Sequence, residues 1–344
     1  MTSSLFSVGI GVGTHNSKGE WLEVFYPAPL LQPSAEVTGV LVDALAFTGG
    51  NHAINLDPAR MIALSEALKG VDDEQASICA KLSSSKQPLV ATVLSTDEAP
   101  TSVPEVYLKL HLLSHRLAKP HSLKLDGMFG VLPNVAWTNQ GAVAIDELSD
   151  RQLEARLKGE LLEVMSVDKF PKMANYVVPA GVRVAHTARV RLGAYLGEGT
   201  TIMHEGFVNF NAGTEGPGMV EGRISAGVVL GSGSDLGGGA STMGTLSGGN
   251  NVIISVGKEC LIGANAGVGI PLGDRCTIEA GLYVTAGSLV TMLDDKGQVV
   301  NTVKARDLAG QSDLLFRRNS KSGAIEVLTN KSAIELNEAL HAHN

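Results

Sequence analysis

The most regular feature of the chain is a hydrophobic pattern that repeats every six residues. It covers 180–291 as seventeen blocks of six, with a two-residue interruption at 222–223 and a longer one at 248–255. In the first and third runs the fifth place of each block is apolar, apart from one threonine. These places are Val184, Val190, Leu196, Ile202, Val208, Thr214, Val220, Cys260, Ala266, Leu272, Ile278, Val284 and Val290.

A period of six fits neither an α-helix nor a simple pleated strand. Short fixed periods are typical of solenoids, and six residues is the repeat of a parallel β-helix, in which each block supplies one strand and one corner. Three blocks would close a triangular coil of about eighteen residues, with the fifth-place side chain inside and coils stacked about 4.8 Å apart. The pattern therefore predicts a parallel β-helix and disfavours a glycine-rich loop or an ordinary sheet.

Residues 1–178 lack this repeat and are predicted to form an α+β domain. The stripe of Leu153, Leu157 and Leu161 is expected to face its core. The G-x-G-x-G run at 9–13 lacks the spacing and the following helix of a nucleotide-binding loop. Local periodicity and turn residues predict a hairpin at 5–26, a helix from Asp57 to Lys69, a strand at 89–94, a helix from Pro104, a strand at 134–145 and a helix at 150–165.

The chain after the repeat is predicted to form a short β extension. A polar turn at 294–297 is followed by a basic run at 303–306, a second basic run at 314–320, a hairpin strand near 324–328 and a short helix at 332–342. The predicted domains are therefore an α+β domain at 1–178, a β-helix at 179–292 and an extension at 293–344.

Composition narrows the classes of function. The 344 residues carry a formal net charge of −8, which argues against a nucleic-acid partner. The sequence shows neither a membrane-spanning apolar run nor the charged and apolar regions of a signal peptide. Cys79, Cys260 and Cys276 share no metal-ligand spacing, and Cys260 falls at an inward place. We therefore expect a reduced, cytoplasmic setting.

The first interruption of the repeat carries Glu221-Gly222-Arg223. A break in a solenoid displaces side chains from the regular wall, so a carboxylate here could act as a general base or as a nucleophile. The alternative is a solvated corner glutamate paired with Arg223. Only His186 and His204 lie in the repeat region, and no histidine occurs between Glu205 and Leu340. A histidine base in the later coils is thus excluded, and a three-histidine zinc site is disfavoured.

Several long motifs resemble one enzyme family. The run at 203–251, which begins MHEGFVNFNAGTEGPGMVEGRISAG, and the motifs IGANAGVGIPLGD, EAGLYVTAG, VKAR and LLFRRNS are similar to tetrahydrodipicolinate N-succinyltransferases, in their long form with a large N-terminal domain. The resemblance implies a left-handed β-helix, a homotrimer and transfer of succinyl from succinyl-CoA to the amine of the ring-opened substrate. This reaction is a step towards diaminopimelate and lysine.

The resemblance also implies roles for individual residues. Glu221 in MVEGRIS would be the catalytic carboxylate, proposed in this branch of the family to form an acyl-anhydride. Arg223 would hold a substrate carboxylate, a task that suits its bidentate fork. The residues implied to contact the acceptor or the pantetheine arm are Gly238, Ser241, Ala264, Glu279, Ala280 and Gly287. Those implied to bind the coenzyme end, where phosphates need cations, are Lys304, Arg317, Arg318, Asn319 and Ser320.

A metal site is a further implication of the resemblance. Glu205 matches a position linked in relatives to a metal on the trimer axis, where three carboxylates would repel unless a cation such as Mg²⁺ bridged them. Relatives carry an acidic residue just before RVRLG, whereas this chain has Ala188. Two other interpretations remain: a different acyltransferase that uses coenzyme A, acting on a sugar or an amino acid, and a non-catalytic β-helix scaffold.

Overall fold

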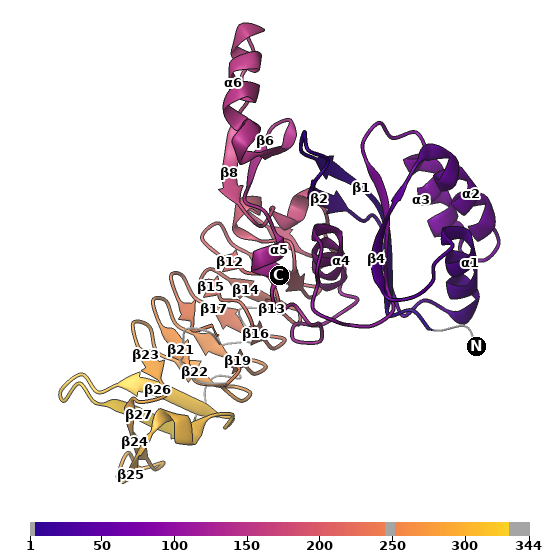
Figure 1. Cartoon of the computed structure of the whole chain (residues 1–344). Helices are drawn as coiled ribbons and strands as arrows, with labels where there is room; N and C mark the ends of the chain where they lie inside the picture. The colour runs from indigo at the N-terminus through magenta and orange to yellow at the C-terminus, as the bar shows by residue number, and fades with distance from the viewer. Residues whose placement is uncertain (1–3, 245–251, 330–344) are drawn as a thin grey trace. The chain divides into compact units, whose positions relative to one another are not determined.

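The computed structural model describes residues 4–244 and 252–329, and the chain folds as two compact units (Figure 1). The first unit holds residues 1–177 apart from two short segments, 119–121 and 172–174, which fold with the second unit. The second unit also contains everything from 178 onwards. The predicted helix at 332–342 lies outside the described residues.

The first unit is built around a β-sheet in the order β2-β1-β5-β4, with β3 also paired to β1. Figure 1 shows α1, α2 and α3 on one side of this sheet and α4 on the other. Leucine, valine and isoleucine side chains from β1 and β5 form the core with the first three helices. The elements are β1 (Ser7–His15), β2 (Trp21–Phe25), β3 (Leu30–Leu31), α1 (Ala35–Leu45), β4 (Asn51–Leu56), α2 (Pro58–Leu68), α3 (Asp73–Leu82), β5 (Leu89–Leu94) and α4 (Val103–Ser114).

Most of the elements expected in this part of the chain are present. β1 and β2 form the predicted hairpin, and β5 is the predicted strand. α2 begins where predicted because the Asp57 side chain accepts a hydrogen bond from the backbone N–H of Arg60, and Pro58 occupies the first turn. Helices α1 and α3 and strand β4 were not predicted, since their apolar residues do not form stripes long enough to stand out.

Two predictions for residues 134–165 were wrong. The single strand at 134–145 is a hairpin of β6 (Val135–Thr138) and β7 (Gly141–Ala144), because Gly141 takes a positive φ of 100° and turns the chain. The helix at 150–165 is α6 (Leu148–Leu157), which ends before Gly159, and the chain then forms β8 (Val164–Asp168). Leu153, Leu157 and Leu161 are 59%, 79% and 58% exposed, so this stripe is not part of a core.

The second unit is a parallel β-helix with three faces. Face 1 contains β9, β11, β14, β17, β20 and β22, face 2 contains β12, β15, β18, β21 and β23, and face 3 contains β10, β13, β16 and β19. The strands are β9 (Arg183–Val184), β10 (Ala194–Leu196), β11 (Thr200–Ile202), β12 (Phe207–Val208), β13 (Ala212–Thr214), β14 (Gly218–Val220), β15 (Arg223–Ile224), β16 (Val229–Leu230), β17 (Asp235–Leu236), β18 (Ser241–Thr242), β19 (Ser255–Val256), β20 (Leu261–Ile262), β21 (Gly267–Gly269), β22 (Thr277–Ile278) and β23 (Tyr283–Thr285).

The coil length departs from eighteen residues at defined places. Ile202 pairs with Val220, eighteen residues on, whereas Val208 pairs with Ile224, sixteen residues on. The first break is therefore a corner shortened by two residues. A second shortened corner follows Val268, because Ile262 pairs with Ile278, again sixteen residues on. The block layout ran through this second corner without a break.

The second shortened corner escaped the sequence pattern because two positions of each block face inward. Cys260 and Ala266, assigned as fifth places, are buried, but so are Val256, four residues before Cys260, and Ile262, two residues after it. All the fifth places of the first and third runs except Val184 are buried, as predicted. The interior is thus filled by pairs of alternate residues, which a single apolar column does not reveal.

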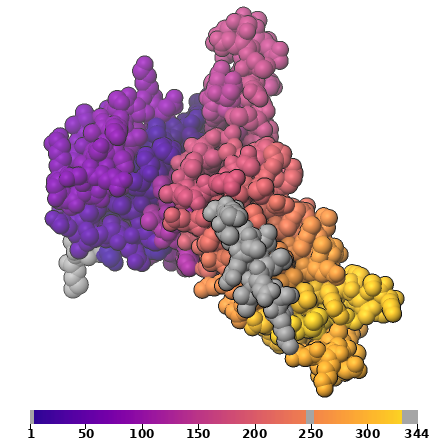
Figure 2. Space-filling model, turned by 180° about the vertical axis from the view of Figure 1, so that it is seen from behind, coloured from indigo at the N-terminus to yellow at the C-terminus, as the bar shows by residue number. Residues whose placement is uncertain are grey.

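The C-terminal strands continue the β-helix. β26 (Leu314–Arg318) pairs in parallel with β22, and β24 (Leu289–Leu293), β25 (Val299–Lys304) and β27 (Ile325–Thr329) extend the same sheet. A short 3₁₀ helix, η4 (Ala305–Leu308), links β25 to β26. Figure 2 shows residues 253–329, in orange to yellow, following one another towards one end of this unit. No helix among residues 4–244 and 252–329 is long and apolar enough to cross a membrane.

Candidate active site

Site residues from distant parts of the sequence collect along the edge between faces 1 and 2. The corners at 203–206, 221–222, 237–239, 263–265 and 279–281 stack in successive coils, and we call this row the carboxylate edge. Backbone hydrogen bonds fix the stacking: Glu221 N–H donates to the Leu236 carbonyl and Gly237 N–H to the Ile262 carbonyl, each at 2.8 Å. The predicted residues on this edge are Glu205, Glu221, Gly238, Ala264, Glu279 and Ala280.

Glu221 occupies the shortened corner of this edge. Gly222 beside it has to be glycine, since a Cβ there would lie 2.4 Å from the Ala240 carbonyl oxygen. The Glu221 side chain reaches over the next coil, and its Oε2 lies 3.3 Å from the place where a Cβ on Gly238 would stand. No ion pair or side-chain hydrogen bond joins Glu221 to Arg223 or to any other residue in the described part of the chain. The side chain is half-buried. Because no described residue pairs with it, the carboxylate is available to a substrate.

Face 2 carries the next two predicted residues on adjacent strands. Arg223 in β15 is the Cα partner of Ser241 in β18, and both are out of phase with the inward residues Ile224 and Thr242. Their side chains therefore point outward from the same face, with Arg223 exposed. A guanidinium and a hydroxyl side by side can hold a carboxylate next to Glu221.

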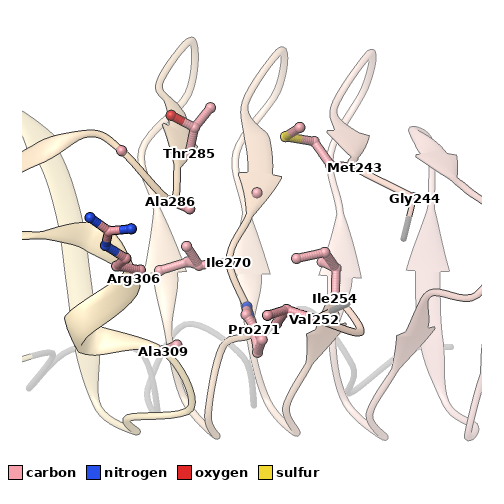
Figure 3. A pocket seen from close by; sticks show the side chains of 12 residues that line it. Met243, Gly244, Val252, Ile254, Ile270, Pro271, Thr285, Ala286, Arg306 and Ala309 are labelled. Atoms are coloured by element: carbon pink, nitrogen blue, oxygen red, sulfur yellow. The ribbon is translucent and has the colours of Figure 1, made fainter. Parts of the chain in front are cut away.

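The other edge of face 2 holds a cavity of about 320 Å³ (Figure 3). It lies at the edge between faces 2 and 3, where the second shortened corner, 269–271, lines it together with residues 243–244, 252 and 254. We call this row the pocket edge. Apart from Arg306 and Thr285, the residues that the structure describes in its walls are apolar or glycine. The lining residues are Met243, Gly244, Val252, Ile254, Gly269, Ile270, Pro271, Thr285, Ala286, Gly287, Arg306 and Ala309.

The predicted coenzyme residues are divided between the two edges. The Arg318 N–H donates to Glu279 Oε2 at 2.7 Å, so the end of β26 lies at the carboxylate edge. Lys304 pairs with Leu289 in β24 and immediately precedes η4, which borders the pocket. Within one chain, the structure does not gather these basic residues into a single phosphate site.

Two of the residues at the end of β26 are already engaged. Arg317 Nε donates to Glu326 Oε2 at 3.0 Å, and Asn319 Nδ2 donates to Glu326 Oε1 at 2.7 Å. Glu326 is buried, at 7% exposed. Its charge therefore needs these donors, and part of what the FRRNS motif does is structural.

The candidate metal residue Glu205 is paired within the chain. Its carboxylate accepts a hydrogen bond from His204 Nδ1 at 2.7 Å and lies 3.8 Å from Arg189 Nη2. His204 and Arg189 lower the pKa of Glu205. No group of three or more histidine, cysteine or carboxylate side chains in the described ranges could hold a metal ion. In a single chain, then, these residues do not fit a metal.

Sequence reasoning missed two features of this unit. His121 folds onto the β-helix, where its Nε2 lies 2.7 Å from the Gly227 carbonyl oxygen, so the unit holds a histidine beyond His186 and His204. Nothing in the sequence indicates this long-range contact. Arg306 lines the pocket. The sequence could have indicated this residue, since it belongs to the same VKAR motif as Lys304.

These features define a β-helix protein of the hexapeptide-repeat class. The model described as hexapeptide repeat of succinyl-transferase matches residues 253–286. The N-terminal and middle models of tetrahydrodipicolinate N-succinyltransferase match residues 60–130 and 132–172. The chain belongs to the tetrahydrodipicolinate N-succinyltransferase family.

Full-length relatives support this membership. A 2,3,4,5-tetrahydropyridine-2,6-dicarboxylate N-succinyltransferase of Pseudomonas putida is 69% identical over 344 residues and covers 100% of both chains. The enzyme of that name from Vibrio cholerae is 57% identical over 340 residues, 98% of this chain and 99% of its own. A Campylobacter jejuni crystal structure, described as a 2,3,4,5-tetrahydropyridine-2-carboxylate N-succinyltransferase, is 31% identical with a TM-score of 0.88, over 96% of this chain and 93% of its own.

Proposed function

We propose that this protein transfers succinyl from succinyl-CoA to the amine of ring-opened tetrahydrodipicolinate, in the diaminopimelate route to lysine. The observation that carries the proposal is Glu221, an unpaired carboxylate on a shortened corner of a β-helix whose full length matches enzymes of this name. A different acyltransferase or a scaffold would not account for the 69% identity over the whole chain.

Glu221 can act by either of two reaction mechanisms. As a general base it takes a proton from the amine while nitrogen attacks the thioester carbonyl. The C–N bond forms, the C–S bond breaks and the proton passes to the departing sulfur. As a nucleophile, a carboxylate oxygen displaces the thiolate to give a mixed anhydride, which the amine then cleaves to restore Glu221.

The acceptor would bind on face 2, beside the carboxylate edge. Arg223 is exposed on β15, one strand from Ser241, and its guanidinium suits one carboxylate of a dicarboxylate acceptor. The neighbouring corner residues Gly238, Ala264 and Ala280 carry little or no side chain, which leaves room along this edge. The donor would approach with its thioester near Glu221.

The test of the proposal is a thiol-release assay on the purified protein, with succinyl-CoA and tetrahydrodipicolinate as substrates. We expect thiol release that needs both substrates, with a succinylated amine detected by mass spectrometry. Release with other amines or sugars but not with tetrahydrodipicolinate would favour the alternative acyltransferase. A lack of thiol release with every donor, together with no thermal stabilisation by coenzyme A, would favour the scaffold.

We also propose a homotrimer, in line with the family resemblance. The carboxylate edge and the pocket edge flank the same face, and the cavity at the pocket edge has no lining residue from the carboxylate edge. A site shared between subunits would bring one edge of each together. An axial Mg²⁺ would depend on Glu205 from three chains, and its pairing with His204 and Arg189 disfavours this. A cytoplasmic location agrees with three cysteines that remain free thiols.

A further inference from the structure

The cavity at the pocket edge has the composition of a site for an amphiphilic anion. Methionine, valine, isoleucine and proline side chains form much of its wall, and its volume of about 320 Å³ is that of a small-ligand pocket. Arg306 is the one charged residue among the described residues that line it. Figure 3 shows the Arg306 side chain beside Ala286 and Ile270, on the side of the cavity opposite Met243 and Ile254.

The backbone of Arg306 is fixed against the cavity wall. Its N–H donates to the Ala286 carbonyl at 3.2 Å, and the N–H of Ala305 donates to the Ser288 carbonyl at 2.8 Å. These bonds tie η4 to the corner at 285–288, which itself lines the cavity. The backbone of Arg306 is therefore already ordered beside the cavity, so only its exposed side chain loses freedom when a ligand binds.

The Arg306 guanidinium has no protein partner in the described part of the chain, since no ion pair or side-chain hydrogen bond involves it. The arginines at the end of β26 differ in this respect. Arg317 donates to Glu326, and Arg318 Nη1 donates to the Gly323 carbonyl at 3.0 Å. Of these three arginines, Arg306 is the one with no guanidinium donor engaged by a described residue, whereas Arg317 and Arg318 each have one donor atom engaged.

We propose that Arg306 binds an anionic group of the acyl donor while the apolar cavity holds the adjoining chain. This inference rests on the proposed function, because it takes succinyl-CoA as the donor. The donor offers two anions of this kind, the distal carboxylate of the succinyl group and the phosphates of the coenzyme. Arg306 recognises either by charge-assisted hydrogen bonds. A role in carboxylate recognition would make it the residue that selects succinyl over uncharged acyl groups.

The experiment compares Arg306→Met with the wild-type protein by isothermal titration calorimetry. The probes are coenzyme A, succinyl-CoA and succinyl-pantetheine, which lacks the phosphates. Arg306→Lys keeps the charge, and Arg183→Met removes an exposed cation of β9, far along the coil stack from the cavity. Unchanged melting temperatures establish that the variants fold.

Arg306→Met is expected to weaken succinyl-CoA about 10- to 100-fold, because hydrogen bonds to charged groups contribute that much. Arg306→Lys should recover part of the lost affinity, and Arg183→Met should bind succinyl-CoA as tightly as the wild type. A loss shared by coenzyme A but absent with succinyl-pantetheine identifies phosphate as the anion. A loss shared by succinyl-pantetheine but absent with coenzyme A identifies the carboxylate.

Equal affinities of Arg306→Met and wild type for all three probes would overturn the inference, as would an equal loss in Arg183→Met. Turnover of the wild-type protein tests the proposed function separately. If the wild type turns over and Arg306→Met binds normally, only the role of Arg306 is lost. If the wild type binds succinyl-CoA through Arg306 but transfers no succinyl group, only the proposed reaction is lost.

Discussion

The two edges of face 2 differ in chemistry although the same repeat builds both. The carboxylate edge carries Glu205, Glu221 and Glu279, and its corners at 237–239 and 263–265 are mostly glycine and alanine. The pocket edge encloses a cavity with apolar walls and one cation, Arg306. Each edge contains one of the two shortened corners, at 221–222 and at 269–271.

The difference shows how a repetitive fold acquires a site. A regular coil presents the same corner geometry at every level, so no corner is special until its length changes. Shortening the corner at 221–222 sets Glu221 over Gly238 in the next coil. On the other side, the shortened corner at 269–271 lines the cavity. We therefore expect the carboxylate edge to carry the chemistry and the pocket edge to carry donor binding.

The largest expected effect comes from Glu221→Gln. The substitution keeps the volume and removes the base or nucleophile, so kcat should fall about 100-fold or more. The dissociation constant for succinyl-CoA should change little, because the proposed contacts with the anionic groups of the donor do not involve Glu221. Glu259→Gln, on a corner of the edge between faces 3 and 1, is the matched control and should keep full activity. Near-normal turnover of Glu221→Gln would contradict the assignment of the chemical step to the carboxylate edge.

The same residue allows its two roles to be separated. Incubation with succinyl-CoA and no acceptor should leave a succinyl mass on the peptide that contains Glu221 if the carboxylate is the nucleophile. A general base should leave the peptide mass unchanged. Rapid acid quench before mass spectrometry limits hydrolysis of an anhydride, and Glu221→Gln serves as the blank.

Gly238→Ala should have the next largest effect. Its Cβ would stand 3.3 Å from Glu221 Oε2, so the carboxylate must shift by a few tenths of an ångström. Catalysis is sensitive to such displacements, and kcat should fall about tenfold while the donor KM stays within twofold. A melting temperature equal to that of the wild type would show that the loss is local. An unchanged kcat would mean that Glu221 is not held in the observed position during the reaction.

Mixed oligomers can show whether the two edges act within one chain or across two. We expect co-expressed Glu221→Gln and Arg306→Met chains to recover activity at low donor concentration, where neither homogeneous variant is efficient. If neighbouring chains share a site, about a quarter of the sites in random trimers should contain both intact elements. If each chain forms its own site, no such recovery should occur. Sedimentation analysis checks that the variants assemble as trimers.

The smallest effects are expected from the C-terminal cations. Lys304→Ala and Arg317→Ala should each raise the donor KM about two- to fivefold, less at high salt, because exposed ionic contacts are weak and screened. They should differ in stability. Arg317→Ala should lower the free energy of unfolding by about 1–3 kcal/mol, since buried Glu326 loses a charged donor. Chemical denaturation measures this, and equal stabilities would show that Glu326 does not depend on Arg317.

Local sequence patterns were sufficient to predict an element where the apolar period repeats many times or where a capping residue marks the start of a helix. The period of six determined the β-helix, because a stack of coils buries the same positions at every level. Asp57 and Pro58 determined the start of α2 through a side-chain cap. The stripe of Leu153, Leu157 and Leu161 misled for the same reason, since periodicity records a helical face but not whether anything covers it. The sequence also indicated Glu221, through the break in register beside it.

Only the tertiary structure decided which residues meet. The corner that holds Glu221 lies beside Gly238, and the end of β26 lies beside Glu279, because stacking joins positions 16 to 39 residues apart. The described residues that line the cavity come from 243–244, 252–254, 269–271, 285–287 and 306–309, so no single segment encodes it. The sequence by itself determined the repeat, the family resemblance and the candidate carboxylate. The separation of the carboxylate from the cavity, and the difference between engaged Arg317 and free Arg306, arise from contacts that local residue patterns do not record.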